Sequence, residues 1–376
     1  NNPLQWAAKG KQYVNYPDGK YMYDKNAAIN PADGNINLGV YDILPSLKSV
    51  SRLGKDVKVP ATISTTFSTP LNKANNYLAT KLEKCGISIA DKAKFNVELA
   101  LCYDKSKNHE YYTLKVTKKG VKIEGNSPAG VLNGVKTLVA ALERSNGTNI
   151  LKEVTIADYP DFHHRGMMLD ISRNYTPYES IKDLLDILAS YKINIFHFHF
   201  NDDEAWRVEI PSLPELTSYG SRKGMTLDEK DFLMQTYAGN GDPNDLSTTA
   251  NGYITADQFV ELVKYADNLG IEIIPEIETP GHARAVIYSM KNRYNKYINT
   301  DRKKAEEFIV WDTEDTTSYV SAQGYSDNVL NLALPGTYRF VKLVIDELDA
   351  MYAKAGVKLK TIHLGGDEVA DGAWNN

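Results

Sequence analysis

The chain has 376 residues, of which 42% are hydrophobic and 24% are charged, as in an ordinary globular protein with one large or two smaller domains. Its formal net charge of -5 and its isoelectric point near 5.9 argue against nucleic acid as a partner. No apolar run approaches the roughly 20 residues that cross a bilayer, so we expect no membrane span.

Cysteine usage and the start of the chain say little about the compartment. Cys85 and Cys102 are too few for a disulfide framework or a cysteine zinc site, and their spacing does not say whether they pair. The chain starts at Asn1 without a methionine or a signal-like segment, so we expect a processed or engineered start. A secreted, periplasmic or cell-surface location is favoured over a cytoplasmic one, and the oligomeric state stays open.

The pattern over residues 1–157 predicts a small α/β domain. Residues 1–60 have little periodicity, and we expect short strands and loops there. Apolar residues then alternate over residues 97–103 and 112–116, which predicts strands with one apolar face. Ser127 is a plausible N-cap of a following amphipathic helix that would cover this face. No cluster of histidines, cysteines or carboxylates occurs here, so we assign the domain a structural role.

Residues 158–376 alternate between strand and helix patterns. Apolar strands are predicted at 166–171, 195–200, 271–277 and 361–368. Such strand-helix units in series predict parallel strands with right-handed crossovers. An open doubly wound sheet is the alternative, but no Gly-x-Gly-x-x-Gly motif follows any strand.

The strand count predicts an incomplete barrel. A closed (β/α)8 TIM-type barrel needs eight strands, but the chain offers four and ends eight residues after Glu368. We therefore expect a barrel domain truncated after its fourth strand, and a chain that is a fragment. Capping boxes are predicted at Thr176 and Thr255, and long polar stretches at 221–252 and 292–328.

Polar residues follow each predicted strand, at the end where barrel active sites gather. They are Asp170 and Arg173, Asp202 and Asp203, Glu278 and His282, and Asp367 and Glu368. The Gly365-Gly366 break allows the adjacent acids Asp367 and Glu368 to turn into one cleft. Neighbouring acids are usually solvated, so this pair alone decides little.

A metal site is the first alternative interpretation. His197 and His199 lie on one face of a strand, and Asp202, His282 and His363 could complete a ligand set. Parallel-strand interiors also contain hydrogen-bonded histidines, and we favour that interpretation. We therefore expect neither a metal nor another cofactor.

Four segments together resemble glycoside hydrolase family 20, the β-N-acetylhexosaminidases. They are Arg165–Arg173, His197–Arg207, Pro275–His282 and His363–Val369, and the similarity covers about residues 95–376. The resemblance implies retaining removal of terminal β-linked GlcNAc or GalNAc from glycans or chito-oligosaccharides. It also implies that the 2-acetamido group of the substrate attacks C1 and forms an oxazolinium-type intermediate, without an enzyme nucleophile.

The resemblance also assigns roles to individual residues. Glu368 would be the general acid and base, and Asp367 would orient the acetamido group. Asp202 and His282 would form a dyad that contacts Glu368, and Arg173 would bind the outer hydroxyls of the sugar. A plain salt bridge from Arg173 to Asp170 and a loop-capping role for His282 are alternatives.

Departures from the family pattern keep other functions open. Glu278 stands where the family commonly has aspartate, and the aromatic pocket walls that the family places on strands five to eight are absent. Trp206 and Trp374 are predicted to pack in the core rather than to stack on sugar. The alternatives are a non-catalytic sugar-binding protein or fragment and a metal-dependent hydrolase that uses His197 and His199. Linkage and the preference between GlcNAc and GalNAc are not readable from the residues.

Overall fold

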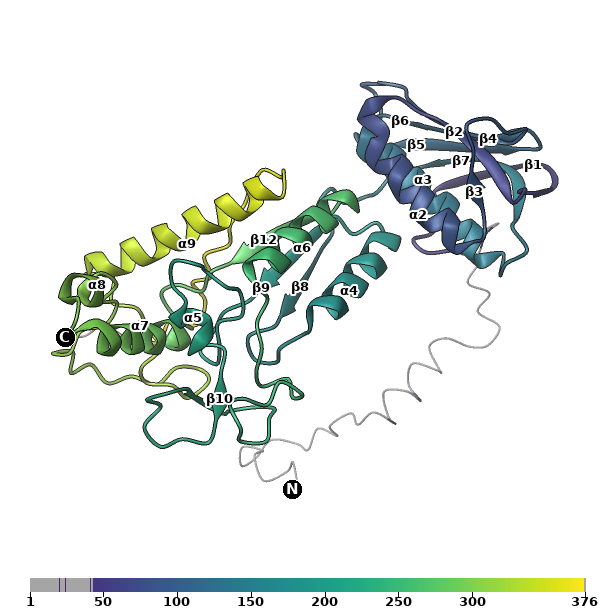
Figure 1. Cartoon of the computed structure of the whole chain (residues 1–376). Helices are drawn as coiled ribbons and strands as arrows, with labels where there is room; N and C mark the ends of the chain where they lie inside the picture. Colours follow the sequence, from purple (N-terminus) through teal and green to yellow (C-terminus); the bar gives the residue numbers. More distant parts are fainter. Residues whose placement is uncertain (1–19, 21–23, 25–40, 42, 375–376) are drawn as a thin grey trace, which may run out of the picture.

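The computed structural model describes residues 43–374 together with Lys20, Asp24 and Tyr41. Two folded parts follow each other along the chain (Figure 1). Most of the stretch that we expected to form short strands and loops lies outside the described residues. Its last part contains β1 (Ser49–Lys58), a strand of ten residues.

The first part is built on a sheet of seven strands among the described residues, in the order β1-β7-β5-β6-β4-β2-β3. Besides β1, these strands are β2 (Thr62–Thr66), β3 (Ser88–Ile89), β4 (Asn96–Leu101), β5 (Tyr112–Thr117), β6 (Gly120–Gly125) and β7 (Ile150–Asp158). The alternating patterns correctly predicted β4 and β5. We did not predict β7, which pairs with β1 across a register shift that interrupts the alternation.

Two helices, α2 (Asn72–Lys84) and α3 (Pro128–Arg144), lie together against this sheet (Figure 1). A short 3-10 turn, η2 (Thr69–Leu71), precedes α2. The side chain of Ser127 accepts a hydrogen bond from the backbone N–H of Gly130, which confirms the predicted N-cap. Most of α3 is buried, because it packs against the sheet and also against its neighbour α2.

The second part contains a parallel sheet in the order β12-β9-β8. Its strands are β8 (Gly166–Asp170), β9 (Ile195–His199) and β12 (Glu272–Glu276), which confirms three of the predicted strands. Helices α4 (Tyr178–Ser190), α6 (Ala256–Asn268) and α9 (Pro335–Lys354) lie along one side of this sheet (Figure 1). Phe198 of β9 stacks on Phe259 of α6, so the apolar core lies between the strands and these helices. Strand alternation places His197 and His199 on the opposite face.

The predicted fourth strand is wrong as a regular element. Next to β12, only His363 forms a parallel bridge, to Glu276. The backbone N–H of His363 donates to Pro275 at 3.0 Å, and the N–H of Ile277 donates back to His363 at 2.9 Å. Gly365 follows with a positive φ of 63°, so extended pairing ends before the two acids. The segment thus lies where a fourth barrel strand would lie, but the barrel is not closed by the described residues.

The structure confirms one of the two predicted capping boxes and shows short elements in the polar stretches. Thr255 forms the predicted capping box with Gln258. The capping box predicted at Thr176 is wrong, because α4 begins one residue later and its N-cap is Pro177 without a side-chain bond. The first polar stretch contains two short strands, β10 (Lys223–Gly224) and β11 (Leu233–Met234), and the short helix α5 (Glu215–Ser218) precedes it. Helix α7 (Arg284–Tyr297) ends inside the second stretch, and α8 (Arg302–Glu306) lies within it. The buried apolar residues of α7 precede residue 292, and α8 buries Ala305, so the stretch itself has little apolar periodicity.

Cys85 and Cys102 are both free thiols, which answers the question of pairing. None of the helices in the described part of the chain is long and apolar enough to cross a membrane.

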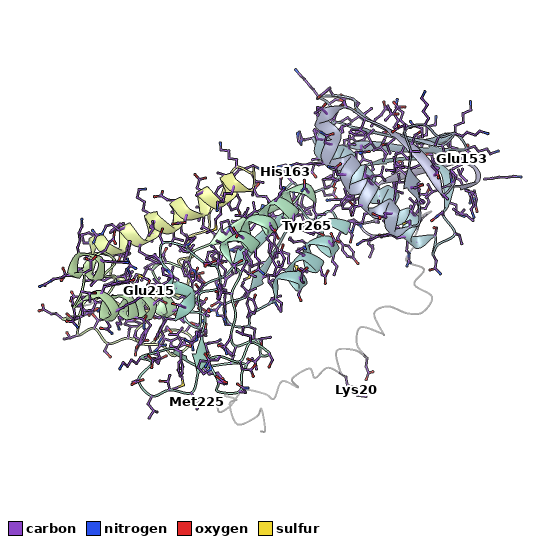
Figure 2. The ribbon with its side chains drawn as sticks, in the orientation of Figure 1. Lys20, Glu153, His163, Glu215, Met225 and Tyr265 are labelled. Carbon is purple, nitrogen blue, oxygen red and sulfur yellow. The ribbon has the colours of Figure 1, made fainter. Side chains whose placement is uncertain are left out.

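Buried ion pairs connect the two parts near His163, which marks the junction in Figure 2. The ammonium of Lys192, two residues after the end of α4, donates to Asp158 of β7 at 3.0 Å and to the hydroxyl of Tyr112 at 3.1 Å. Arg165, directly before β8, pairs with Glu110 at 2.8 Å. We proposed the domain boundary between residues 157 and 158, at the end of β7.

We predict that Lys192→Met destabilises the protein by about 3 kcal/mol, because Asp158 would remain buried without its cation. Chemical denaturation followed by circular dichroism measures this difference. Lys115→Met, on the exposed side of β5, is the matched control and should change stability by less than about 0.5 kcal/mol. Equal stability of the two variants would contradict the structural role of this ion pair.

Candidate active site

Side chains from all three strand ends and from the segment after His363 meet at one edge of the parallel sheet. Every residue that we predicted for the site takes part in this network: Arg173, Asp202, His282, Asp367 and Glu368. Parallel strands bring these residues together because all their carboxyl ends lie on the same edge.

The two adjacent acids face the same side. Carboxylate oxygens of Asp367 and Glu368 and a ring nitrogen of His282 all lie within 4.8 Å of one another. Both acids are exposed, whereas His282 is only 2% exposed. Gly365, Gly366 and Glu368 all have positive φ angles, so the backbone turns and the acids do not alternate as they would in a strand. The break at Gly365-Gly366 therefore turns both acids to one side, as predicted.

His282 is a buried cation between carboxylates. Its Nδ1 lies 3.2 Å from Asp202 and 3.3 Å from Asp203, and its Nε2 lies 3.5 Å from Glu368. Hydrogen bonds to Asp202 and Asp203 raise the pKa of His282 to about 11, despite its burial. Its φ of 49° is strained for a residue other than glycine. The predicted pairing with Asp202 is present, and Asp203 shares it.

Asp203 also organises the loops around the site, a role that the sequence analysis did not predict. Its carboxylate accepts hydrogen bonds from the amide of Asn328 at 2.9 Å and from the backbone N–H of Arg284 at 3.2 Å. These bonds join the end of β9 to the start of α7 and to the loop before α9. Nothing in the local pattern could identify Asn328, because it is 125 residues away.

Arg173 is held by three carboxylates. Its guanidinium lies 2.9 Å from Asp170, 2.8 Å from Asp202 and 3.1 Å from Glu204. The alternative salt bridge to Asp170 is therefore present. These anions raise the pKa of Arg173 although its partial burial opposes them. A guanidinium has five N–H groups, so donors remain for a ligand on the exposed quarter of the side chain. We did not predict Glu204.

A row of alternating charges lies beneath the site. His199 donates to Glu276 at 2.5 Å and contacts Asp202 at 2.9 Å. Burial alone would lower the pKa of His199, but bonds to Asp202 and Glu276 raise it to about 10. Burial would raise the pKa of Asp202, yet bonds from His199 and His282 and the charge of Arg173 lower it to about 2. Opposite charges thus stabilise one another without access to water.

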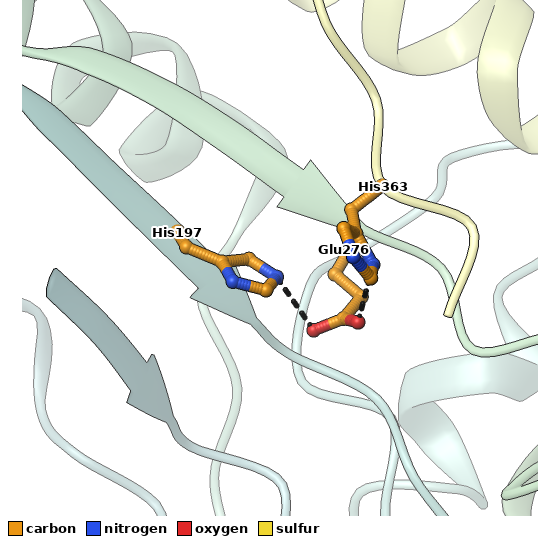
Figure 3. Close-up of side chains that lie close together, drawn as sticks. All are labelled: His197, Glu276 and His363. Atoms are coloured by element: carbon orange, nitrogen blue, oxygen red, sulfur yellow. Dashed lines mark ion pairs between the residues drawn. The ribbon is translucent and has the colours of Figure 1, made fainter. Parts of the chain in front are cut away.

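Glu276 binds two further histidines (Figure 3). His363 Nδ1 lies 2.6 Å from one carboxylate oxygen, and His197 Nε2 lies 2.8 Å from the other, outside the direction of a hydrogen bond. The centres of the His197 and His363 rings lie 4.7 Å apart. These two nitrogens lie closer to the carboxylate oxygens than two ligands of one metal normally lie to each other, so a metal could bind only after the rings and the carboxylate had moved apart. The geometry favours paired histidines beneath the site over the metal alternative.

Glu278 is a buried carboxyl directly below the glycine turn. It is 2% exposed, and its Oε2 has no hydrogen-bond partner among the described residues. A Cβ on Gly365 would lie 1.9 Å from this oxygen, so only glycine leaves it room. Burial, followed by a hydrogen bond with Glu276 and the negative charges of Glu276 and Asp367, raises the pKa of Glu278 to about 8. At neutral pH, Glu278 therefore keeps its proton.

Two loop residues also contact carboxylates of the candidate site. The amide of Gln323 donates to Glu368 at 2.6 Å, and the hydroxyl of Tyr325 donates to Glu204 at 3.4 Å. Both lie in the second long polar stretch, which we predicted only as a region. Side chains contributed from such a loop leave no periodic signal in the sequence.

Arg207 and the tryptophans have structural positions. Arg207 is fully buried and donates to five backbone carbonyls, those of Ile171, Ser172, Ser221, Ala250 and Gly252. Trp206 packs edge-on against Phe340 in the core, as predicted. The prediction that Trp374 packs in the core is wrong, because its side chain is 47% exposed. Its ring N–H donates a hydrogen bond to the backbone carbonyl of Leu330.

The structure as a whole is a small α/β domain followed by part of a (β/α)-type catalytic domain with a carboxylate-rich edge. Residues 162–376 match the family described as "Glycosyl hydrolase family 20, catalytic domain", and residues 40–159 match "Glycosyl hydrolase family 20, domain 2". The chain belongs to glycosyl hydrolase family 20.

Individual relatives agree with this family. A β-hexosaminidase of Vibrio vulnificus is 36% identical over 297 residues, which is 79% of this chain and 34% of the relative. An N,N'-diacetylchitobiase of Vibrio harveyi is 36% identical over 259 residues, 68% of this chain and 29% of the relative. The chain thus spans about a third of the length of these curated relatives.

Solved structures have the same fold. An exo-β-N-acetylglucosaminidase of family 20 from Vibrio harveyi, in complex with N-acetylglucosamine, superposes with a TM-score of 0.71 at 31% identity. It covers 89% of this chain, which in turn covers 48% of that structure. A Streptomyces plicatus N-acetyl-β-hexosaminidase superposes with a TM-score of 0.64 at 27% identity, with 87% and 59% covered.

We predict that Glu278→Gln is more stable than the wild type at pH 8. An unfolded glutamate ionises near pH 4.5, but folded Glu278 holds its proton to about pH 8. The wild type therefore loses stability as the pH rises between these values, and the variant does not. We expect a gain of at least about 1 kcal/mol at pH 8, since each pKa unit corresponds to about 1.4 kcal/mol, and almost none near pH 4.5.

Denaturant titrations at several pH values measure this dependence. Glu83→Gln, on the exposed side of α2, is the control and should follow the wild type throughout. A difference between Glu278→Gln and wild type that did not change with pH would refute the raised pKa.

Proposed function

We propose that the protein containing this chain is a retaining exo-β-N-acetylhexosaminidase. It removes terminal β-linked GlcNAc or GalNAc from glycans or chito-oligosaccharides, and the substrate's own acetamido group is the nucleophile. The observation that carries this proposal is the grouping of Asp367, Glu368 and the buried cation His282 within 4.8 Å. The names of the relatives, which include a chitobiase and a structure in complex with N-acetylglucosamine, support the same substrate class.

In the first step, Glu368 protonates the glycosidic oxygen as that bond to C1 breaks. The acetamido carbonyl oxygen forms a new bond to C1, and the ring of the oxazolinium-type intermediate closes. Asp367 accepts the acetamido N–H and offsets the positive charge that develops on this group. The position of Asp367 beside Glu368 supports this division of roles, because the acetamido group and the leaving oxygen lie on neighbouring parts of the sugar.

In the second step, the ionised Glu368 accepts a proton from water while the water oxygen attacks C1. The C1–carbonyl bond breaks, the acetamido group is restored, and the anomeric configuration is retained after two displacements. His282 stabilises the carboxylate of Glu368 between the two steps, since its positive charge lies 3.5 Å away. Gln323 donates to the same oxygen and limits its rotation.

Arg173 and Asp202 serve substrate binding and charge placement. Arg173 offers its remaining N–H groups to the outer hydroxyls of the sugar. Asp202 holds both Arg173 and His282, at 2.8 Å and 3.2 Å, and so couples the binding side of the site to the acid-base side. The proposal concerns the full protein, because this chain matches only about a third of the length of its curated relatives.

We predict that Glu368→Gln lowers the kcat of the full protein about 10²- to 10⁴-fold on N,N'-diacetylchitobiose, because a glutamine cannot protonate the leaving sugar. The loss in the first step should be smaller on p-nitrophenyl β-GlcNAc, since nitrophenolate leaves with little protonation. Steady-state kinetics on both substrates measure this. Glu179→Gln, an exposed acid of α4, is the control. Equal rates for wild type and Glu368→Gln, or GlcNAc binding without turnover in the wild type, would defeat the assignment.

We also predict that Asp367→Asn weakens binding of a thiazoline analogue of the intermediate at least about 10-fold, because the carboxylate that faces the analogue's ring nitrogen loses its charge. Inhibition constants for the two proteins give this ratio. Unchanged inhibition, or a glycosyl-enzyme detected by mass spectrometry of the trapped protein, would contradict substrate assistance.

A further inference from the structure

A cavity of about 460 Å³ lies at the junction of the two parts, at the amino ends of the strands and thus opposite the candidate active site. Its walls include Asn133 and Lys136 of α3, Arg165 before β8, Asn194 before β9, and Glu272 of β12. Neither part forms this cavity alone. The proposed catalytic mechanism does not involve this cavity.

Lys136 is the unusual residue in this cavity. It is only 3% exposed, and its ammonium has no hydrogen bond or ion pair with any residue that the structure describes. Its nearest aromatic partner is the ring of Tyr77 in α2, with the ring centre 5.9 Å away. A buried ammonium is costly unless an anion or hydrogen-bond acceptor compensates it. Lys136 therefore lacks a partner of the kind that such groups require.

The surrounding charges do not compensate Lys136. Lys192 is paired with Asp158 at 3.0 Å, and Arg165 is paired with Glu110 at 2.8 Å. Burial first, and then the positive charges of Arg165 and Lys192, lower the pKa of Lys136 to about 7, although Glu110 opposes this shift.

Other ionisable groups also line the cavity. They are His109, His163, His164, Lys73, Lys358 and Lys360, with Asp267 and Glu272 as the anions that pair with Lys73 and Lys360. The walls therefore contain more cations than anions. An entering negative ion would meet a favourable potential.

We propose that this cavity binds a small oxyanion, such as sulfate, phosphate or a carboxylate, on the ammonium of Lys136. The anion supplies the missing partner of Lys136, while Lys192 and Arg165 add positive potential from the other part of the molecule. Because residues of both parts form the cavity, the bound anion stabilises their junction. This site is independent of the proposed catalytic function.

Sulfate is a suitable probe because its charge of two is constant from pH 6 to pH 8.5. We expect millimolar sodium sulfate to raise the melting temperature by several degrees in a saturable way, beyond sodium chloride at equal ionic strength. Lys136→Met should remove this response, and Lys115→Met, on the exposed side of β5, should retain it. If Lys136→Met does not fold, calorimetric titration of sulfate into Lys136→Gln replaces this comparison.

The response should also depend on pH. Lys136 becomes protonated as the pH falls through about 7, so sulfate should bind more tightly at pH 6 than at pH 8.5. The cavity histidines are present in both proteins, so the difference between wild type and Lys136→Met isolates the lysine. A wild type that responds to sulfate no more than to chloride, or as the Lys136 variants do, would overturn the proposal.

Discussion

The structure of the site depends on one buried carboxylate, that of Asp202. It is 1% exposed and contacts three cationic side chains, those of His199, His282 and Arg173, at 2.9, 3.2 and 2.8 Å. Desolvation of a carboxylate is so unfavourable that it persists only with such partners. Since Arg173 follows β8, His199 ends β9 and His282 follows β12, the neutralisation of Asp202 ties three strand ends together.

This arrangement extends as a row of alternating charges toward the exposed acids. Glu276, His199, Asp202 and His282 follow one another, and the last of them lies 3.5 Å from Glu368. Each ionised group is stabilised by its neighbours, so a change of charge at one affects the next. Charges that their partners already hold in place need no reorganisation when charge develops on a substrate. The network therefore supports both the stability of the edge and the proposed chemistry.

The same edge contains strained backbone. His282 and Glu368 have φ angles of 49° and 48°, which residues other than glycine seldom adopt. Such conformations persist where surrounding contacts hold them. His282 is held by Asp202 and Asp203, and Glu368 follows Gly365 and Gly366, whose positive φ angles turn the chain. Two residues that bear such a backbone cost therefore lie 3.5 Å from each other in the site.

Much of this protein follows from the sequence alone, because strand alternation, helix stripes and strand-end polar residues are local patterns. They predicted β8, β9, β12 and the cap at Ser127, and they placed eight polar residues at strand ends, from which the family resemblance selected the five proposed site residues. They overestimated the strand before Gly365-Gly366, which is reduced to one bridge at His363, although the break at these glycines was predicted. Only the tertiary structure decided that both Asp202 and Asp203 contact His282, that Gln323 contacts Glu368, and that Lys136 is buried without an anion. These contacts join residues dozens of positions apart, and the protonation states follow from the resulting burial and charge, neither of which a local pattern contains.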